Sequence, residues 1–598
     1  MSSQDPDVRL DSAPVSSQGE APGIISARID GADEPWTLRP WLMAGICTVA
    51  GLLFHLFTQD QRGASSPSLN FGLAALVAVS SLSFVLGVER RRWQWAALFS
   101  AFWGLVIGLI AWRMAHYASS GDLWGWPLLS GILAVLIATP FFQTRRDVAA
   151  NGRQWRLWQL PYARLHDHAW TDAVIGAAAL IFSGISLLLM LLIGGMFGLI
   201  DIDVISDLLE ESWFRWMLAG ASFGGAVGLL RERDRLVSVM QRLVMVVLSI
   251  LVPVLAVAVA LFLISLIGTG LAPLWESGFS ASILLLLTAA ASVLLANAVL
   301  GNRLAERSGN RLLHMGAVVL TVAVLPMSAI AASAMALRVG QYGWTPERLW
   351  GAIAVVVALS YGLAGCWAAL QGYRARAARA DGFAEILRPL QQKLAIGVMV
   401  LAALLALPIA DFGAISAHDQ VARLKSGRVS AEDFDWRAMA FQYGPAGRRS
   451  LEGLAASGHQ EWTKLAKTAL ASKDSWGASA DIQAAIAVPI EQRLRVMPDG
   501  ASLPQDARTI LQEGQCQSAY MCVVYVMGPQ HIILISQRRP NHYPDQTELM
   551  KSADGKWKNP PFYPSARMIP DLKTADVVLE TKERRRLIVG DMAQDWLN

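Results

Sequence analysis

Residues 244–270 read VMVVLSILVPVLAVAVALFLISLIGTG, an uninterrupted run without a charged side chain. A helix needs roughly 20 apolar residues to cross the hydrocarbon core of a membrane. Soluble proteins rarely contain so long an uncharged helix, because a surface helix keeps one polar face toward water. The stretch therefore predicts a transmembrane helix.

Similar stretches occur on both sides of this one, and together they predict about eleven membrane-spanning helices. The composition agrees, because 54% of the 598 residues are hydrophobic and only 16% are charged, whereas roughly a quarter are charged in soluble proteins. Disordered, coiled-coil and collagen-like folds are thereby excluded for most of the chain. The expected spans are 41–59, 70–88, 94–112, 126–142, 173–200, 213–230, 244–270, 281–300, 315–337, 349–373 and 394–412.

The loops between these spans alternate between arginine-rich and arginine-poor. One alternating set holds about 20 positive residues and the other about 4, and positive loops stay on the cytoplasmic side of a membrane. The N-terminus is therefore expected in the cytoplasm, where residues 1–40 form a disordered polar tail. Because the number of spans is odd, the C-terminal region is expected on the opposite side.

The organisation that follows is a helix bundle over residues 41–412, a helical neck over 413–475 and a periplasmic α+β domain over 476–598. In the neck, Ser430 and Asp433 resemble a capping box at the start of a helix. In the last domain, β-rich runs flank the turn Gly528-Pro529-Gln530 and predict a hairpin. The expected strands are 520–527, 531–536, 576–580 and 587–589.

Cys516 and Cys522 lie close together at the entry to this hairpin. An oxidising compartment would permit a disulfide between them, and two free thiols are the alternative. Cys47 and Cys366 lie inside spans and are expected to be packing residues.

The segment Gly220-Ala221-Ser222-Phe223-Gly224 matches the G-x-S-x-G pattern of a serine nucleophile. That nucleophile needs a strand before the serine, whereas this segment lies inside an expected membrane helix. Small residues at every fourth position let membrane helices approach closely, so helix packing is the favoured interpretation. The glycines expected to serve packing are Gly104, Gly108, Gly194, Gly198, Gly220, Gly224 and Gly228.

Two polar clusters are candidates for metal binding. Asp201 and Asp203 form a D-x-D pattern that could hold a divalent ion in a membrane glycosyltransferase. The favoured alternative is that these acids mark the non-cytoplasmic side. His166 and His168 offer two imidazoles, but two ligands do not complete a metal site. We therefore expect no cofactor, and the segment around these histidines is interpreted as an amphipathic interfacial stretch.

The expected spans carry almost no ionisable residues away from their ends, with His55 and Asn297 as the main polar exceptions. Buried charges usually mark ion or proton pathways in membranes. A proton- or sodium-coupled transporter is therefore disfavoured. A conduit for apolar or lipid cargo remains an alternative, because prolines in several spans could kink the helices.

Two segments carry a resemblance to a known family. The first, 338–349, reads RVGQYGWTPERL, and the second runs from Asp411-Phe412-Gly413 through Gln420-Val421-Ala422-Arg423-Leu424 to Phe434-Asp435. Together they resemble the bacterial inner-membrane proteins grouped as domain-of-unknown-function family 4153. The resemblance covers roughly residues 40 to 445 and implies a multi-pass inner-membrane protein. It implies no reaction, substrate or cofactor.

Both segments also have a physical interpretation. Thr345-Pro346-Glu347 has the pattern of a helix start, with a capping hydroxyl, a first-turn proline and an acidic residue. Because both segments are expected on the same side of the membrane, we expect Arg348, Asp411 and Asp435 to help dock the C-terminal region.

The sequence therefore predicts an all-α polytopic membrane bundle followed by an extracytoplasmic α+β domain. The leading interpretation of function is a non-enzymatic sensor or scaffold of the bacterial inner membrane. Its expected partners are membrane lipids and a protein bound by the periplasmic domain, and no nucleic acid. The alternatives are a flippase-like conduit for a hydrophobic or lipid substrate and a glycosyltransferase-like membrane enzyme.

Overall fold

The structure is a computed structural model of the chain, and it divides the protein into two compact units. The first unit contains long helices, and the second contains the turn 338–350 and everything from Asp411 onward. Each unit is considered by itself. The described residues are 36–59, 67–117, 125–150, 156, 159–276, 281–301, 310–375, 382–486, 493–498, 500–513, 516, 520–537, 545–552, 555, 557–558, 585–589 and 592–597.

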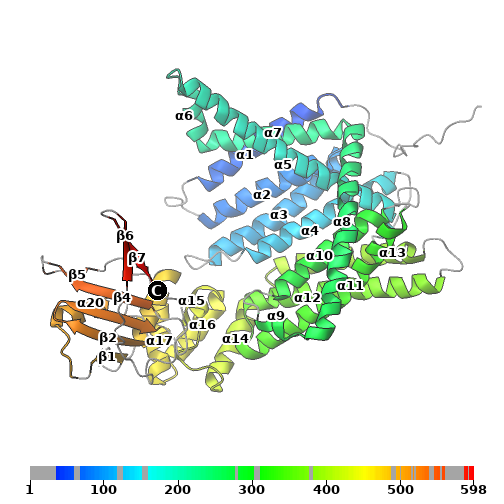
Figure 1. Ribbon diagram of the computed structural model, residues 1–598. Coiled ribbons are helices and arrows are strands. Elements are labelled where there is room, and N and C mark those ends of the chain that lie inside the picture. The colour runs from blue at the N-terminus through cyan, green and yellow to red at the C-terminus, as the bar shows by residue number, and fades with distance from the viewer. Residues whose placement is uncertain are drawn as a thin grey trace, which may run out of the picture. The chain divides into compact units, whose positions relative to one another are not determined.

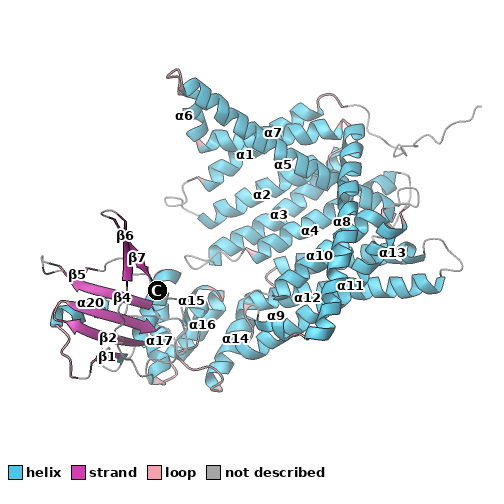
Figure 2. Ribbon diagram, in the orientation of Figure 1, coloured by secondary structure: helices cyan, strands magenta, loops and turns pink. Residues whose placement is uncertain are grey.

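The first unit is entirely helical among its described residues (Figures 1 and 2). Ten of its helices are long and apolar enough to cross a membrane, so the chain is a multi-pass membrane protein and the predicted fold class is confirmed. The helices are α1 (Arg39–Thr58), α2 (Pro67–Gly87), α3 (Trp93–Tyr117), α4 (Trp126–Ala150), α5 (Tyr162–Gly198), α6 (Val204–Glu210), α7 (Ser212–Arg231), α8 (Asp234–Thr269), α9 (Ala272–Glu276), α10 (Ala281–Leu300), α11 (Arg311–Tyr342), α12 (Pro346–Ala375) and α13 (Gly382–Ala406).

Several helices extend beyond the apolar windows that predicted them. Helix α4 continues to Ala150 instead of ending at 142, and α5 begins at Tyr162 instead of 173. A helix satisfies its own backbone hydrogen bonds, so it can continue into the polar headgroup region, where side chains need not be apolar. The segment with His166 and His168 is therefore the first part of α5. At the other end of the bundle, α13 stops at Ala406, short of the expected 412.

The sixth expected span, 213–230, corresponds to α7, which is not among the ten apolar helices. Helix α7 nevertheless lies antiparallel along α1. Gly228 lies beside Pro40, Gly220 beside Cys47, and Trp216 beside Gly51. A Cβ atom on Gly220 would lie 2.1 Å from the Cys47 carbonyl oxygen. Glycine thus permits the close approach of the two backbones.

Two large hydrophobic clusters of described residues form most of the core of the bundle, beside two small ones. One contains Met43, Ile175 and Val227 of α1, α5 and α7, and the other centres on Leu320 and Met327 of α11. Helix α8 contributes to both, with Val237 in the first cluster and Val252 in the second. In Figure 1 its ribbon runs from beside α7 toward α10. Helix α8 therefore bridges the two parts of the bundle.

The second unit begins with five short helices that share one hydrophobic core around Trp436, Met439 and Leu451. The helical part continues to Ile486, beyond the expected end of the neck at 475. Ser430 and Asp433 do form reciprocal hydrogen bonds, but they close a turn, and the next helix begins at Trp436. The helices are α14 (Phe412–Lys425), α15 (Trp436–Phe441), α16 (Gly444–Ala455), α17 (Gln460–Ala471) and α18 (Ser475–Ile486).

A five-stranded sheet of order β1-β2-β3-β4-β5 follows (Figure 2). The predicted hairpin is present, with Val523 opposite Ile535 in the antiparallel pair of β2 and β3. Strand β1 is parallel to β2, and α20 (Gln505–Glu513) packs on one face through Leu511. The expected strand 576–580 lies outside the described residues. The strands are β1 (Leu494–Met497), β2 (Met521–Gly528), β3 (His531–Gln537), β4 (Asp545–Lys551) and β5 (Trp557–Lys558), and a separate pair is β6 (Arg585–Val589) with β7 (Met592–Leu597).

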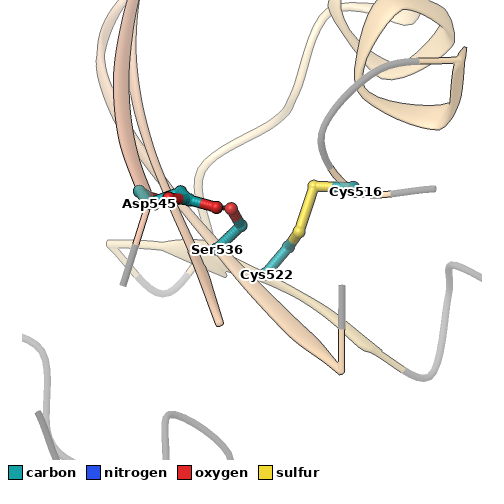
Figure 3. The surroundings of a disulfide bond; sticks show 4 residues. All are labelled: Cys516, Cys522, Ser536 and Asp545. Carbon is teal, nitrogen blue, oxygen red and sulfur yellow. Dashed lines mark hydrogen bonds between the residues drawn. A yellow bond between two sulfur atoms is a disulfide. The ribbon is translucent and has the colours of Figure 1, made fainter. Parts of the chain in front are cut away.

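A disulfide joins Cys516 to Cys522 of β2, with the two Cα atoms 6.1 Å apart (Figure 3). Both cysteines are almost fully buried, against Leu511 and Val524. The bond therefore ties the segment after α20 to the start of the central hairpin. Cys47 and Cys366 are free thiols.

Candidate functional site

Helix α14 contacts the turn between α11 and α12. The helix starts at Phe412 because the Asp411 carboxylate accepts a hydrogen bond from the Ala414 N–H at 2.9 Å, as an N-cap residue does. Farther along α14, the Asp419 carboxylate accepts a hydrogen bond of 2.7 Å from the backbone N–H of Trp344. This contact fixes the turn to the helix.

Two further side chains of α14 bind the last carbonyl groups of α11. The Gln420 amide donates to the carbonyls of Tyr342 and Trp344 at 2.9 and 3.0 Å. The buried Arg423 guanidinium donates to the carbonyls of Gly340 and Gln341. The final carbonyls of a helix have no partner within it, and a cation is favourable beside them. Helix α14 therefore completes the C-terminus of α11.

Gly343 makes this approach possible. Its φ angle is +74°, a conformation that glycine adopts without strain. A Cβ atom at this position would lie 2.5 Å from an Asp419 carboxylate oxygen. We call the contact of Asp419, Gln420 and Arg423 with the turn 340–344 the neck clamp.

The three residues predicted for docking occupy neighbouring positions. Arg348 donates to the carbonyls of Tyr342 and Gly343, at 3.1 and 2.6 Å. Asp435 caps α15 by accepting from the Ala438 N–H at 2.8 Å. Burial, and then the charge of Asp435, raise the pKa of the Tyr443 hydroxyl, whereas Arg348 acts in the opposite direction. The charges of Arg348 and Asp435 therefore both act on Tyr443, and their joint role in docking remains a prediction.

Sequence analysis missed the residues that make the neck clamp. Gln420 and Arg423 stand in one of the two segments that carry the family resemblance, and Asp419 directly precedes them. Residues 419, 420 and 423 share one side of a helix. Polar residues in that spacing, on a helix whose other side is apolar, were the available signal.

The acidic loop does not assemble into a metal site. Asp201 and Asp203 are exposed, and Asp203 precedes α6 without a capping hydrogen bond from its side chain. No group of three or more metal-ligating side chains occurs within the described part of the chain. The structure therefore lends no support to a divalent ion at these residues.

Ser222 lies within α7, with no strand before it. Its hydroxyl contacts the Leu218 carbonyl at 2.7 Å and the Ser183 hydroxyl at 3.0 Å. These are bonds within α7 and to α5, as expected of a packing residue.

The remaining packing glycines lie against neighbouring helices or turns. Gly104 and Gly108 face Ser80 and Leu76 of α2, and Gly194 faces Ser206 of α6. A Cβ atom added at Gly198 would lie 3.7 Å from a carboxylate oxygen of Asp203. Of these four glycines, Gly104 and Gly108 lie closest to the neighbouring helix, α2.

The structure also pairs arginines of the arginine-rich loops with acids that sequence analysis did not consider. Arg146 is buried and forms ion pairs with Glu89 and, at 3.1 Å, with Asp147. Glu89 and Asp147 both stand beside arginines in the sequence. Because acids contribute little to membrane orientation, acids at these positions indicated ion pairs with the arginines. The other pairs are His168–Asp147 at 2.9 Å, Arg231–Asp172 at 3.1 Å and Arg39–Glu232 at 3.3 Å.

The comparisons with known proteins gave one match. A family model described as "Domain of unknown function (DUF4153)" matches residues 71–440. The match contains both sides of the neck clamp and ends before the sheet. No curated protein and no solved structure matches the chain.

Proposed function

The chain belongs to the family described as Domain of unknown function (DUF4153), and from the neck clamp we propose that it is a sensor or scaffold of the bacterial inner membrane. In this proposal the N-terminus is cytoplasmic, and the sheet domain lies in the periplasm and binds a protein there. When the sheet domain binds this protein, the neck changes position and thereby changes the ends of α11 and α12. The proposed role is non-enzymatic.

The neck clamp is the observation that carries the proposal. Asp419, Gln420 and Arg423 bind backbone atoms, so they hold the turn by its main chain and not through mobile side chains. Arg423 is only 9% exposed, and buried hydrogen bonds to a charged group are stronger than exposed ones. A displacement of α14 would therefore move the ends of α11 and α12.

Two observations support the proposed orientation. Helix α7 is 20 residues long, which at 1.5 Å per residue gives about 30 Å, the thickness of the hydrocarbon core. Because α7 lies antiparallel along α1, it supports an eleventh crossing, and in this proposal the odd number of crossings puts the two ends of the chain on opposite sides. A disulfide between Cys516 and Cys522 suits an oxidising compartment.

The first test concerns orientation. A reporter enzyme that is active only in the periplasm is fused after Asn598, and a cytoplasmic reporter is fused there in a second strain. We expect only the periplasmic reporter to be active. Activity of the cytoplasmic reporter would overturn the proposal.

The second test separates a sensor from a lipid conduit. The full chain is reconstituted into vesicles, and the transfer of a fluorescent phospholipid between leaflets is measured with a membrane-impermeant quencher. We expect the same rate as in protein-free vesicles. In cells, a photocrosslinking residue at Met527 or Met550, both on the exposed surface of the sheet, should capture one defined periplasmic or envelope protein. Rapid lipid transfer without a crosslink would favour the conduit.

The third test concerns relay. Arg423→Ala removes the guanidinium that holds Gly340 and Gln341, while Arg428→Ala removes an exposed arginine from the turn that follows the same helix. We expect Arg423→Ala to increase amide hydrogen exchange in 338–350 by about tenfold, the effect of losing about 1.4 kcal/mol. The control should leave exchange unchanged. Equal amide hydrogen exchange in 338–350 of both variants would contradict the proposal that the neck transmits a change to α11 and α12.

A further inference from the structure

The ends of three helices meet at a polar position between the two parts of the bundle. Tyr162 is the first residue of α5, Leu300 is the last residue of α10, and Arg388 lies in the first turns of α13. The Tyr162 hydroxyl donates to the Gln391 side chain at 3.3 Å. The Gln392 amide donates to the Leu160 carbonyl at 3.0 Å, so α13 is held against the start of α5.

His166 contributes an unused donor at this position. The Trp170 indole N–H donates to His166 Nε2 at 3.1 Å. An indole nitrogen can only donate, so Nε2 must be the acceptor, and the neutral imidazole then carries its proton on Nδ1. Nδ1 is buried and has no hydrogen-bond partner in the part of the chain that the structure describes.

Arg388 contributes a second unused donor. One terminal nitrogen of its guanidinium donates to the Leu300 carbonyl at 2.8 Å, but the buried Nε atom has no partner among the described side chains and backbone groups. The charge of Arg388 acts on both Tyr162 and His166, and no carboxylate among the described residues does so. The guanidinium thus keeps an N–H group with no acceptor among the described residues.

An oxyanion can accept from both unused N–H groups, those of His166 and Arg388. It supplies several acceptor atoms, and a guanidinium binds phosphate oxygens through parallel N–H donors. Basic pockets between helix ends are also where lipid headgroups bind. Because the three helices all start or end here, the position is level with the headgroups of the surrounding lipid. We propose that Arg388 and His166, beside Tyr162, form a binding site for the phosphate of an anionic phospholipid.

The test measures thermal unfolding of the full-length protein in detergent. The added ligands are phosphatidylglycerol, phosphatidylcholine of the same chain length, and inorganic phosphate. A ligand that binds only the folded state raises the midpoint in proportion to its affinity. We expect phosphatidylglycerol to stabilise the wild-type protein and the other two ligands to have little effect.

Variants identify the site. Arg388→Gln should weaken phosphatidylglycerol binding at least tenfold, and His166→Phe should weaken it severalfold while retaining an aromatic ring. The matched control is Lys393→Gln, which removes an exposed charge from the same helix and should bind within twofold of the wild type. Arg388→Lys keeps the charge and loses the Nε donor, so it should bind more weakly than the wild type but more tightly than Arg388→Gln.

Three results would overturn the assignment. The first is equal binding of phosphatidylglycerol by the wild type and by Arg388→Lys and His166→Phe. The second is equal stabilisation of the wild type by phosphatidylcholine. The third is equal stabilisation by inorganic phosphate alone, which would assign the site to a soluble anion. The comparison of ligands on the wild type decides the matter even where Arg388→Gln does not fold.

Discussion

The Asp419 carboxylate accepts a hydrogen bond of 2.7 Å from the backbone N–H of Trp344, 75 residues earlier in the chain. The bond joins the two sequence segments that resemble the DUF4153 family. Each segment alone reads as a helix start, and neither shows that it contacts the other. Their contact explains why a glycine stands at 343, between the end of one membrane helix and the start of the next.

Gly343→Ala should therefore disrupt the neck clamp. The added Cβ atom would lie 2.5 Å from Asp419 and 2.7 Å from Arg423, and the φ angle of +74° disfavours alanine in addition. We expect a loss of about 1–3 kcal/mol in the stability of the second unit, typical of strain at such a position. Limited proteolysis of the neck measures it.

The matched control is Gly340→Ala in the same turn, where no atom lies within 4 Å of the added Cβ. Because Gly340 lies in α11, alanine should stabilise that helix slightly. Equal protease sensitivity of the two variants would contradict the close approach at Gly343.

Arg348 and Asp435 should act together. Both groups influence Tyr443, and residues that share a partner show non-additive effects of about 0.5–3 kcal/mol. Arg348→Ala and Asp435→Ala are compared singly and in combination by protease sensitivity of the neck. The double variant should lose less stability than the sum of the two. Strict additivity would show that Asp435 acts only as the cap of α15.

The disulfide should stabilise the sheet domain. Cys516 and Cys522 are separated by 6 residues, and closing so short a loop stabilises a fold by about 2 kcal/mol. Cys516→Ser should lower the stability by this amount in chemical denaturation monitored by hydrogen exchange of β2. A reductant should destabilise the wild type equally and leave Cys516→Ser unchanged. A wild type unaffected by the reductant would contradict a stabilising bond.

The sheet domain should also be sensitive to acid. Asp506 of α20 accepts hydrogen bonds from the Lys551 ammonium and, at 3.1 Å, from the Trp557 indole. The bond from Lys551, followed by that from Trp557, lowers the pKa of Asp506. Its stabilising effect is complete above the ordinary carboxyl pKa of about 3.9 and is lost as the pH falls through the lowered value in the folded state.

Asp506→Asn should therefore lose stability at neutral pH and show a flatter dependence below about pH 4. Thermal melting between pH 2.5 and 7 measures this, with Glu452→Gln in α16 as an exposed control. A curve for Asp506→Asn parallel to that of the wild type would exclude a role for this carboxylate.

The membrane fold could be predicted because it depends on a local property. An uncharged run such as 244–270 is sufficient to identify a span, and β-rich runs on both sides of the turn Gly528-Pro529-Gln530 identify the hairpin. Contacts between distant segments were not predictable in this way. Asp419 and Trp344, or Arg388 and Leu300, meet only through the packing of several helices, and a single sequence contains no measure of that packing. The α7 span was predicted by its position between two loops, although its own apolar content is lower than that of the ten others.

Helix α7 provides the last prediction. Its pairing with α1 requires a bare backbone at Gly220, where an added Cβ would lie 2.1 Å from the Cys47 carbonyl oxygen. At Gly225 of the same helix the nearest atom, the Ala44 Cβ, is 3.7 Å away. Gly220→Ala should separate the helices and destabilise the protein by about 1–3 kcal/mol, as overpacking does, whereas Gly225→Ala should be close to neutral. Thermal unfolding in detergent compares the two variants. If both melt like the wild type, α7 does not pack against α1 along its length, and the support for an eleventh crossing is lost.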